Sequence, residues 1–559
     1  MRTVDWIVVA AYLTWVIADG LRMSRRTNEM EGYLLASRSL PWWAVGLSVM
    51  ATQLSAITMT STTGQGYADG LRFVQFYFGL PIAMIILSVT VVPFFWRARV
   101  YTAYEYLERR FDVKTRTLTA VLFLISRGLS CSVIIAAPAL ILSIILGWNL
   151  TLTVLAIGVP TVLYTMVGGV QAVTWTDVKQ MGIVVFGILA AVVVLILGLP
   201  DGIGLGSALH VAGAAGKMQA LDFRFDLTQK YTFWSGMIGA VFLFLSYFGC
   251  DQSQVQRYLT AKSVQQGRQS LFVSAFVKIP LQALILFTGV LVFVFFLFNK
   301  GPMLFNSEPL DAIKAGPHAA EYAAIERQYD TAFEIRREAA TALASRDNDV
   351  SRATFLAADL AVRDVRARAS ALVKDATHAN YADVNYVFPS FVLNYMPAGL
   401  TGLLIAAIFL AAMSSSGGEL NSLATTTVID VYRRHIKPDA DDAHYLLVSK
   451  LSTAGWGLFV CIAAVYAGQL GSLIEVVNRY GSYFYGSILG VFILALGVKR
   501  ANGHGAFVGL IGGMVAVALV ATSTKVEFLW LNVVGAVAVT VVGIIVSEVT
   551  RGREVRAAE

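Results

Sequence analysis

The chain has 559 residues, of which 57% are hydrophobic and 14% are charged, and its formal net charge is +7. No soluble globular domain has this balance, whereas a helical membrane protein with many spans does. The positive charge is explained by basic loops, so we expect no nucleic-acid partner. The sequence has no GxxxxGK motif, and we therefore expect no ATP-driven transport.

Apolar segments long enough to cross a bilayer recur along the chain. The candidate spans are residues 4–22, 43–64, 73–96, 117–146, 149–167, 178–200, 232–250, 271–299, 399–424, 446–470, 474–497, 504–523 and 527–548. The first lacks a small-residue cleavage site, so we interpret it as a retained helix and not as a signal peptide. The sequence predicts an all-α polytopic membrane protein with about thirteen transmembrane helices, in the plasma (inner) membrane.

Lysine and arginine are concentrated in alternate connecting segments. The positive-inside rule assigns those segments to the cytoplasm. This assignment places the N-terminus outside and the C-terminus in the cytoplasm.

The second and seventh spans contain polar runs. Residues 51–64 are rich in threonine and serine, and residues 246–252 include a tyrosine, an aspartate and a glutamine. Both segments are expected to be discontinuous helices whose freed carbonyl groups line a cavity. They begin two blocks of five spans, which are inverted because five is odd. Interrupted helices at corresponding positions of inverted halves point to a transporter site.

One region, residues 300–386, is charged and rich in alanine. Apolar residues at helical spacing, a turn at 347–349 and a second helix over 350–375 predict an extracytoplasmic helical hairpin. It could be a lid, a partner surface or an insertion without a role. The predicted organisation is an extra helix and loop (1–42), a first repeat (43–230), the start of the second repeat (231–299), the hairpin (300–386), the rest of the second repeat (387–498) and two final helices with a tail (499–559).

The ninth span carries three consecutive hydroxyls, Ser414–Ser416, after a wholly apolar stretch. A hydroxyl in hydrocarbon is costly unless it has a partner. Ser414 lies in the inner half of its span at about 1.5 Å per residue, as do Ala51 and Leu54 in theirs. We favour coordination of a weakly held monovalent cation over a role in close helix packing.

Other polar groups within spans have two interpretations each. Asp177 is an ion ligand or a helix N-cap, and Lys278 points at a solute or extends to the interface. Arg127 is interpreted first as a structural counter-ion. Tyr247 stacks on a solute or only packs. Arg479 extends to the outer interface, while its neighbour Asn478 faces the cavity.

These segments together resemble the sodium/solute symporter family, which includes sodium/glucose, sodium/proline and sodium/sialic acid cotransporters. The resemblance covers nearly the whole chain except 300–386. The motifs that carry it are Thr102–Leu107 with Arg110-Phe111, Gly168-Gly169 with Ala172-Val173 and Thr176–Gln180, Asp251-Gln252 with Val255–Arg257 and Ala261-Lys262, Ala411–Ser415 with Asn421-Ser422, and Lys499–Ala506.

The resemblance implies a leucine-transporter-type 5+5 inverted repeat and a sodium site between the second and ninth spans. The implied sodium ligands are the carbonyl groups of Ala51, Leu54 and Ala411 and the hydroxyls of Ser414 and Ser415. It also links Asp177 to sodium coupling. Some family members bind a second sodium through hydroxyls one turn later, where this chain has Gly417 and Gly418. We therefore expect one Na+ per cycle.

The same resemblance implies a solute site. Its candidate residues are Gln53, Thr58, Gln75, Tyr247, Phe248, Lys278 and Asn478. Their polar and aromatic character suits a polyhydroxylated small molecule, so a sugar or polyol is the first expectation. Arg127 and Arg479 keep an organic anion, such as a sialic acid or a monocarboxylate, in consideration.

The sequence is also compatible with different functions and couplings. A membrane solute sensor on the same fold, an uncoupled facilitator, and coupling to protons or lithium all fit it. An enzyme fits poorly, because no nucleophile–base or metal constellation is visible. The oligomeric state is not indicated.

Overall fold

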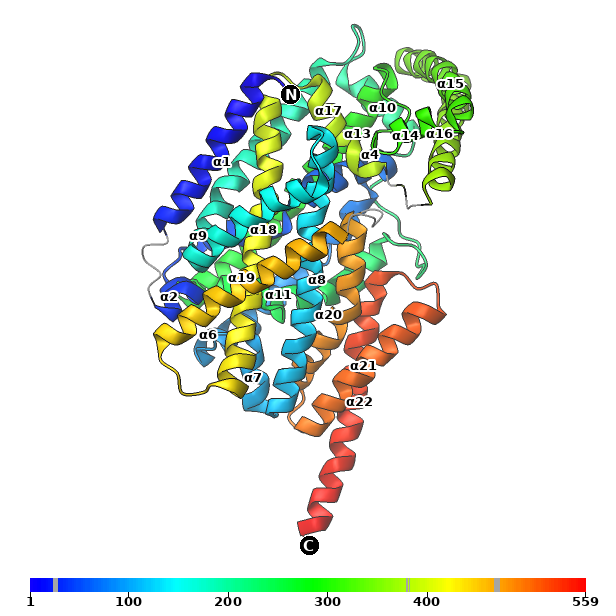
Figure 1. Cartoon of the computed structure of the whole chain (residues 1–559). Coiled ribbons are helices and arrows are strands. Elements are labelled where there is room, and N and C mark those ends of the chain that lie inside the picture. Colours follow the sequence, from blue (N-terminus) through cyan, green and yellow to red (C-terminus); the bar gives the residue numbers. More distant parts are fainter. Residues whose placement is uncertain (24–28, 379–380, 382, 467–472, 559) are drawn as a thin grey trace.

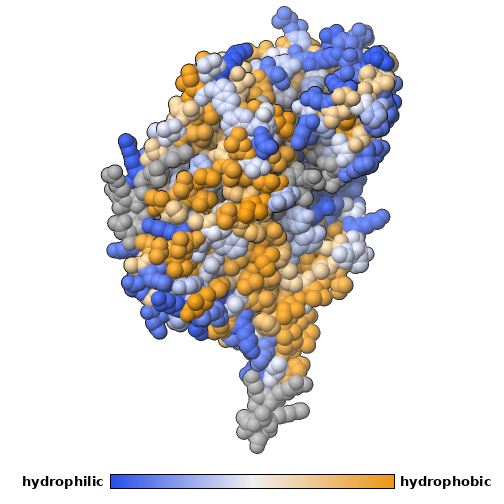
Figure 2. Space-filling view, viewed as in Figure 1, coloured by the Kyte–Doolittle hydropathy of each residue, from blue (hydrophilic) through white to orange (hydrophobic). Residues whose placement is uncertain are grey.

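The computed structural model describes residues 1–23, 29–378, 381, 383–466 and 473–558, and within these residues it consists of helices without any β-strand. Nine helices of this part are long and apolar enough to cross a membrane, so the all-α membrane architecture is confirmed but the count of thirteen is not. Apolar residues cover the middle of the visible face, and hydrophilic residues gather towards its two ends (Figure 2).

The first half of the chain contains the first discontinuous helix. The α-helices of this half are α1 (Thr3–Met23), α2 (Met30–Leu35), α3 (Trp42–Gln53), α4 (Thr63–Asp69), α5 (Leu80–Val89), α6 (Val91–Ala98), α7 (Ala103–Arg110), α8 (Val113–Leu146), α9 (Leu150–Leu197) and α10 (Leu205–Ala214). A π-helical segment, Thr58–Thr62, joins α3 to α4 after a break at residues 54–55. The predicted interruption of the second span is therefore present.

The two predicted spans 149–167 and 178–200 lie on either side of a kink within α9, where the helical backbone is interrupted. The chain changes direction inside it at Gly169, whose φ of +56° is a conformation that glycine adopts readily. The carbonyl oxygen of Tyr33 lies where a Cβ at this position would be. A side chain there would be strained and would also collide with α2.

The second half contains the second discontinuous helix and the hairpin. Its helices are α11 (Ala240–Gly249), α12 (Gln252–Leu259), α13 (Val264–Phe298), α14 (Leu310–Ala315), α15 (Ala319–Ser345), α16 (Asp349–Thr377), α17 (Val387–Tyr395), α18 (Leu400–Thr426), α19 (Asp442–Tyr466), α20 (Leu473–Gly497), α21 (Gly503–Ser523) and α22 (Phe528–Ala558). The seventh span breaks between α11 and α12 as predicted. Residues 467–470 of the predicted tenth span lie outside the described part.

The predicted hairpin is formed by α15 and α16. Asn348 caps α16 by accepting a hydrogen bond from the backbone N–H of Ser351, and the Ser351 side chain bonds back to the Asn348 backbone. Figure 1 shows the hairpin at the end of the molecule that holds the N-terminus, with the C-terminus at the opposite end. This arrangement agrees with termini on opposite sides of the membrane. Which terminus faces the cytoplasm stays a prediction.

Two helices of the core approach each other through glycines. A Cβ at Gly289 of α13 would overlap the carbonyl oxygen of Thr63, and a Cβ at Gly66 of α4 would overlap that of Leu286. Small residues let helix backbones come this close in a membrane. The second half of the first discontinuous helix, α4, is thus held directly against α13.

This contact generates a stability prediction. Gly289→Ala should destabilise the protein by about 1–3 kcal/mol, because the added methyl group must push α4 away from α13. The check is the melting temperature of the purified protein in detergent. Gly182→Ala is the matched control, since a Cβ at Gly182 of α9 meets no atom within 4 Å. Equal melting temperatures for the two variants would contradict the close contact.

Candidate functional site

The end of α3 leaves backbone carbonyl groups buried inside the protein. The Leu54 N–H bonds to the carbonyl oxygen of Ala51 at 2.9 Å and to that of Met50 at 3.0 Å. The carbonyl oxygen of Gln53 accepts the Thr58 hydroxyl at 2.9 Å and the Lys278 ammonium group at 3.4 Å. The C-terminal end of a helix also carries partial negative charge. This break therefore provides oxygen atoms and a field that favour a cation.

A buried carboxylate lies beside this break. Asp177 accepts hydrogen bonds from the Ser48 hydroxyl at 2.5 Å, from Nη1 of Arg257 at 2.7 Å and from the Ser414 hydroxyl. These contacts join α3, α9, α12 and α18 at one side chain. Asp177 lies well inside α9, so the interpretation as a helix N-cap is wrong.

The three hydroxyls of the ninth span have three different environments, although all three residues are fully buried. Ser414 donates to Asp177, and Ser416 donates to the carbonyl oxygen of Ala412 at 2.6 Å within its own helix. The Ser415 hydroxyl has no hydrogen-bond partner among the described residues. A buried polar atom without a partner is uncommon in folded proteins. Because α18 packs against α3, this hydroxyl is a candidate ligand for an ion at the break.

The glycines after these serines make room for other side chains. A Cβ at Gly418 would overlap Nη2 of Arg257, and a Cβ at Gly417 would overlap the hydroxyl of Tyr164. The space beside Gly418 therefore contains a guanidinium group, which is paired with Asp177.

A cavity of about 90 Å³, with room for several water molecules, lies next to the break. Of the predicted solute residues, Gln53, Thr58, Tyr247 and Asn478 line it, and Arg127 lines it as well. Sequence reasoning missed other lining residues, which include Phe76, Tyr77, Phe244, Glu419 and Tyr485. Glu419 had a signal that could have found it, because an ionisable residue inside a span is a functional candidate.

The remaining candidates are not among the lining residues. Lys278 is fully buried and donates to the Gln53 carbonyl group, so it supports the break. Phe248 packs edge-on against Tyr247. Gln75 bonds to the segment between α10 and α11, accepting from the backbone N–H of Asp222 and donating to the carbonyl oxygen of Tyr231. Arg479 is exposed.

Arg127 is held by two carboxylates. Its Nε lies 2.5 Å from Oδ2 of Asp251, its Nη1 lies 2.8 Å from Oε1 of Glu419, and its Nη2 lies 2.5 Å from the hydroxyl of Tyr485. The guanidinium also lies over the ring of Tyr247, 4.9 Å from its centroid. These contacts agree with the interpretation as a structural counter-ion.

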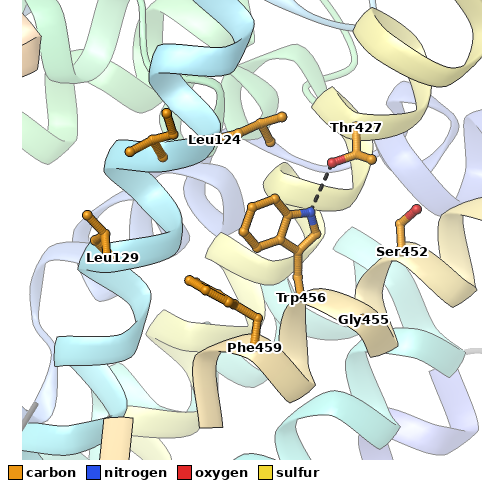
Figure 3. Close-up of a pocket in the computed structure, with 8 residues that line it drawn as sticks. Leu124, Leu129, Thr427, Ser452, Gly455, Trp456 and Phe459 are labelled. Atoms are coloured by element: carbon orange, nitrogen blue, oxygen red, sulfur yellow. Dashed lines mark hydrogen bonds between the residues drawn. The ribbon is translucent and has the colours of Figure 1, made fainter. Parts of the chain in front are cut away.

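A larger pocket, of about 490 Å³, lies between α8, the end of α18 and α19. Figure 3 shows its wall, where Trp456 donates through Nε1 to the Thr427 hydroxyl at 2.9 Å. Leucine, isoleucine and phenylalanine make up most of the remaining wall. The pocket lacks charged groups among its described lining residues, so its chemistry suits an apolar chain and not a polar solute.

Comparison with known proteins agrees with this architecture. The model of the "Sodium:solute symporter family" matches residues 33–326 and 356–513, and the unmatched gap falls in the hairpin. The sodium/glucose cotransporter of Vibrio parahaemolyticus is 27% identical over 525 residues, which cover 91% of this chain and 84% of that protein. The sodium/sialic acid symporter SiaT of Proteus mirabilis (strain HI4320) is 26% identical over 554 residues, which cover 97% of this chain and 94% of that protein.

A solved structure has the same fold. It is the substrate-bound, outward-open state of a Na+-coupled sialic acid symporter, which matches with a TM-score of 0.77 and 24% identity over 98% of both chains. The fold likeness extends over the whole membrane part and confirms the predicted architecture. The chain belongs to the sodium:solute symporter family, whose members are transporters and not enzymes.

Proposed function

We propose that this protein is a plasma-membrane symporter that uses inward sodium flow to import a sugar or polyol, with its N-terminus outside and its C-terminus in the cytoplasm. Sodium-coupled solute transport follows from family membership. The observation that carries the ion site is the buried Ser415 hydroxyl, which has no partner among the described residues, on a helix packed against the broken α3. The proposed ligands are the carbonyl groups of Ala51, Leu54 and Ala411 and the hydroxyls of Ser414 and Ser415.

The cavity lining supports a hydroxylated solute over an organic anion. Gln53, Thr58 and Asn478 offer amide and hydroxyl groups, and Tyr247 offers an aromatic ring. Arg127 is the cation on the wall, and two carboxylates already bind it. An anionic solute would have to compete with both.

The coupling mechanism follows from the shared walls of the two sites. Residues 52 and 53 precede the break and residue 55 lies in it, and all three line the cavity, so an ion that fixes the break fixes part of the solute site. Sodium binding first would therefore preform the outward-facing cavity, and the solute would then close it around Tyr247. Asp177 transmits the state of the break to α12 and α18 through Arg257 and Ser414. Coupling is the difference in ion and solute affinity between the outward-open and inward-open states.

Ser415→Ala should reduce sodium-driven uptake in proteoliposomes at least tenfold, because it removes a proposed ion ligand whose hydroxyl has no hydrogen-bond partner among the described residues. Ser416→Ala is the matched control, since that hydroxyl is already bonded within its own helix. Its sodium dependence should stay within about twofold of the wild type. Unchanged sodium dependence in Ser415→Ala would overturn the site.

The transport stoichiometry should be one sodium per solute. The position where a second hydroxyl set would lie carries Gly417 and Gly418, and the guanidinium of Arg257 fills the adjoining space. The sodium-activation curve should be hyperbolic. In reversal-potential measurements on proteoliposomes, the membrane potential at which net transport stops should correspond to a coupling ratio of one sodium ion per solute molecule. A coupling ratio of two would show that the guanidinium leaves room for another ion.

A further inference from the structure

Glu419 is a buried carboxylate that lines the cavity and has one oxygen without a hydrogen-bond partner among the described residues. Its side chain is 2% exposed, and it lies in α18 one turn after Ser415. Oε1 accepts the hydrogen bond from Arg127, whereas Oε2 has no hydrogen-bond partner among the described residues. Glu419 itself lines the cavity next to the broken helix. A carboxylate oxygen in such a place needs a donor, and the solute is the molecule that enters.

The one positive charge of Arg127 does not compensate the negative charges of both Asp251 and Glu419. Asp251 already matches the guanidinium charge through its Oδ2, while its Oδ1 accepts from the backbone N–H and the hydroxyl of Ser253. Arg127, Asp251 and Glu419 therefore sum to one negative charge. A charge in surplus is costly in a buried site unless an opposite charge compensates it.

Two other buried cations lie near this cluster, and both are directed elsewhere. Arg257, beside Gly418, is paired with Asp177. The ammonium group of Lys278 donates to the Gln53 carbonyl group and lies over the ring of Tyr77, 5.7 Å from its centroid. It is not among the lining residues, and no described carboxylate forms an ion pair with it. Lys278 thus stabilises the break and does not neutralise Glu419.

Aromatic rings complete the wall. Phe76, Tyr77, Phe244, Tyr247 and Tyr485 line the same cavity as Glu419. Ring faces attract cations, and the combination of rings with a carboxylate is typical of sites for ammonium groups. A neutral hydroxyl could donate to Oε2 but would leave the surplus charge uncompensated. A protonated amine satisfies the oxygen, the charge and the rings together.

We propose that Glu419 binds a protonated amino group of the transported solute, which is therefore a hydroxylated amine such as an amino sugar or amino alcohol. This inference rests on the proposed solute symport and narrows its substrate class. Arg127 is then a positioning residue, which fixes Oε1 so that Oε2 faces the cavity. The amine would dock on Oε2 while Gln53, Thr58 and Asn478 contact the hydroxyl groups.

The test uses the full chain in nanodiscs with saturating sodium and matched solute pairs. The pairs are glucosamine with glucose, galactosamine with galactose, and ethanolamine with ethylene glycol, with N-acetylglucosamine as the blocked amine. Affinities come from thermal stabilisation and from sodium-driven uptake in proteoliposomes. At least one amine should bind tenfold or more tightly than both its neutral partner and its blocked form.

The variant Glu419→Gln should abolish that preference while keeping the stabilisation by sodium alone. Glu419→Asp, which retains the charge on a shorter side chain, should keep the preference at reduced affinity and provides the test if Glu419→Gln does not fold. Ser416→Ala is the control in the same helix. Binding of neutral or blocked solutes as tightly as amines, binding of no amine in the panel, or an undiminished preference in Glu419→Gln would overturn the proposal.

The failures of the two proposals are distinguishable. If sodium alone does not stabilise the wild-type protein and does not drive uptake, the proposed sodium symport fails. If sodium acts as expected but Glu419→Gln instead changes the sodium affinity and leaves solute preference intact, Glu419 is an ion ligand and the amine assignment is wrong.

Discussion

A helix that breaks inside a bilayer must find partners for its freed backbone groups within the protein, because hydrocarbon offers none. The architecture around the cavity depends on this constraint. At the first break, the Gln53 carbonyl group is satisfied by Thr58 and Lys278. At the second, the Ser246 carbonyl group accepts the N–H groups of residues 250 and 251, and Asp251 caps α12. The breaks are stable because backbone N–H groups and side chains of the protein satisfy these carbonyl groups, and polar groups that have no such partner form the site.

The short helix α12 connects the two buried charge clusters. Asp251 at its start binds Arg127, and Arg257 near its end binds Asp177. Between them, Gln256 donates to the carbonyl group of Leu34 and to Asn421 of α18. A shift of α12 would therefore disturb the solute side and the ion side together. Removing one partner of a buried ion pair is costly, so such a shift must be compensated by new contacts. That requirement is a physical basis for two discrete states instead of a continuous range.

The sequence predicted features that follow from local chemistry. Polar runs in apolar spans located both breaks, and helical spacing with a turn located the hairpin. It also separated the two spans that meet at the Gly169 kink of α9, but it did not predict that the second helix resumes directly after that glycine. It left open whether Lys278 points at a solute or extends to the interface, and the structure has its ammonium group donate to the Gln53 carbonyl group. The direction in which a buried lysine points depends on packing between distant segments, and span-by-span reasoning contains no information about that.

The role of Glu419 also depends on a contact between distant segments that the sequence does not reveal. Its sequence context, an acid one turn beyond three serines, suits an additional ion ligand. The structure pairs it instead with Arg127 of α8, a residue 292 positions away along the chain. Because of this pairing, one carboxylate oxygen of Glu419 is hydrogen-bonded and the other has no hydrogen-bond partner among the described residues. Arg257 takes the space beside Gly418, so α18 meets a fixed cation on each of two sides. The guanidinium beside Gly418 fills the space that a second sodium ion would need, which favours a single ion at the break. The oxygen of Glu419 that Arg127 does not bind is then left for a charge that arrives with the solute.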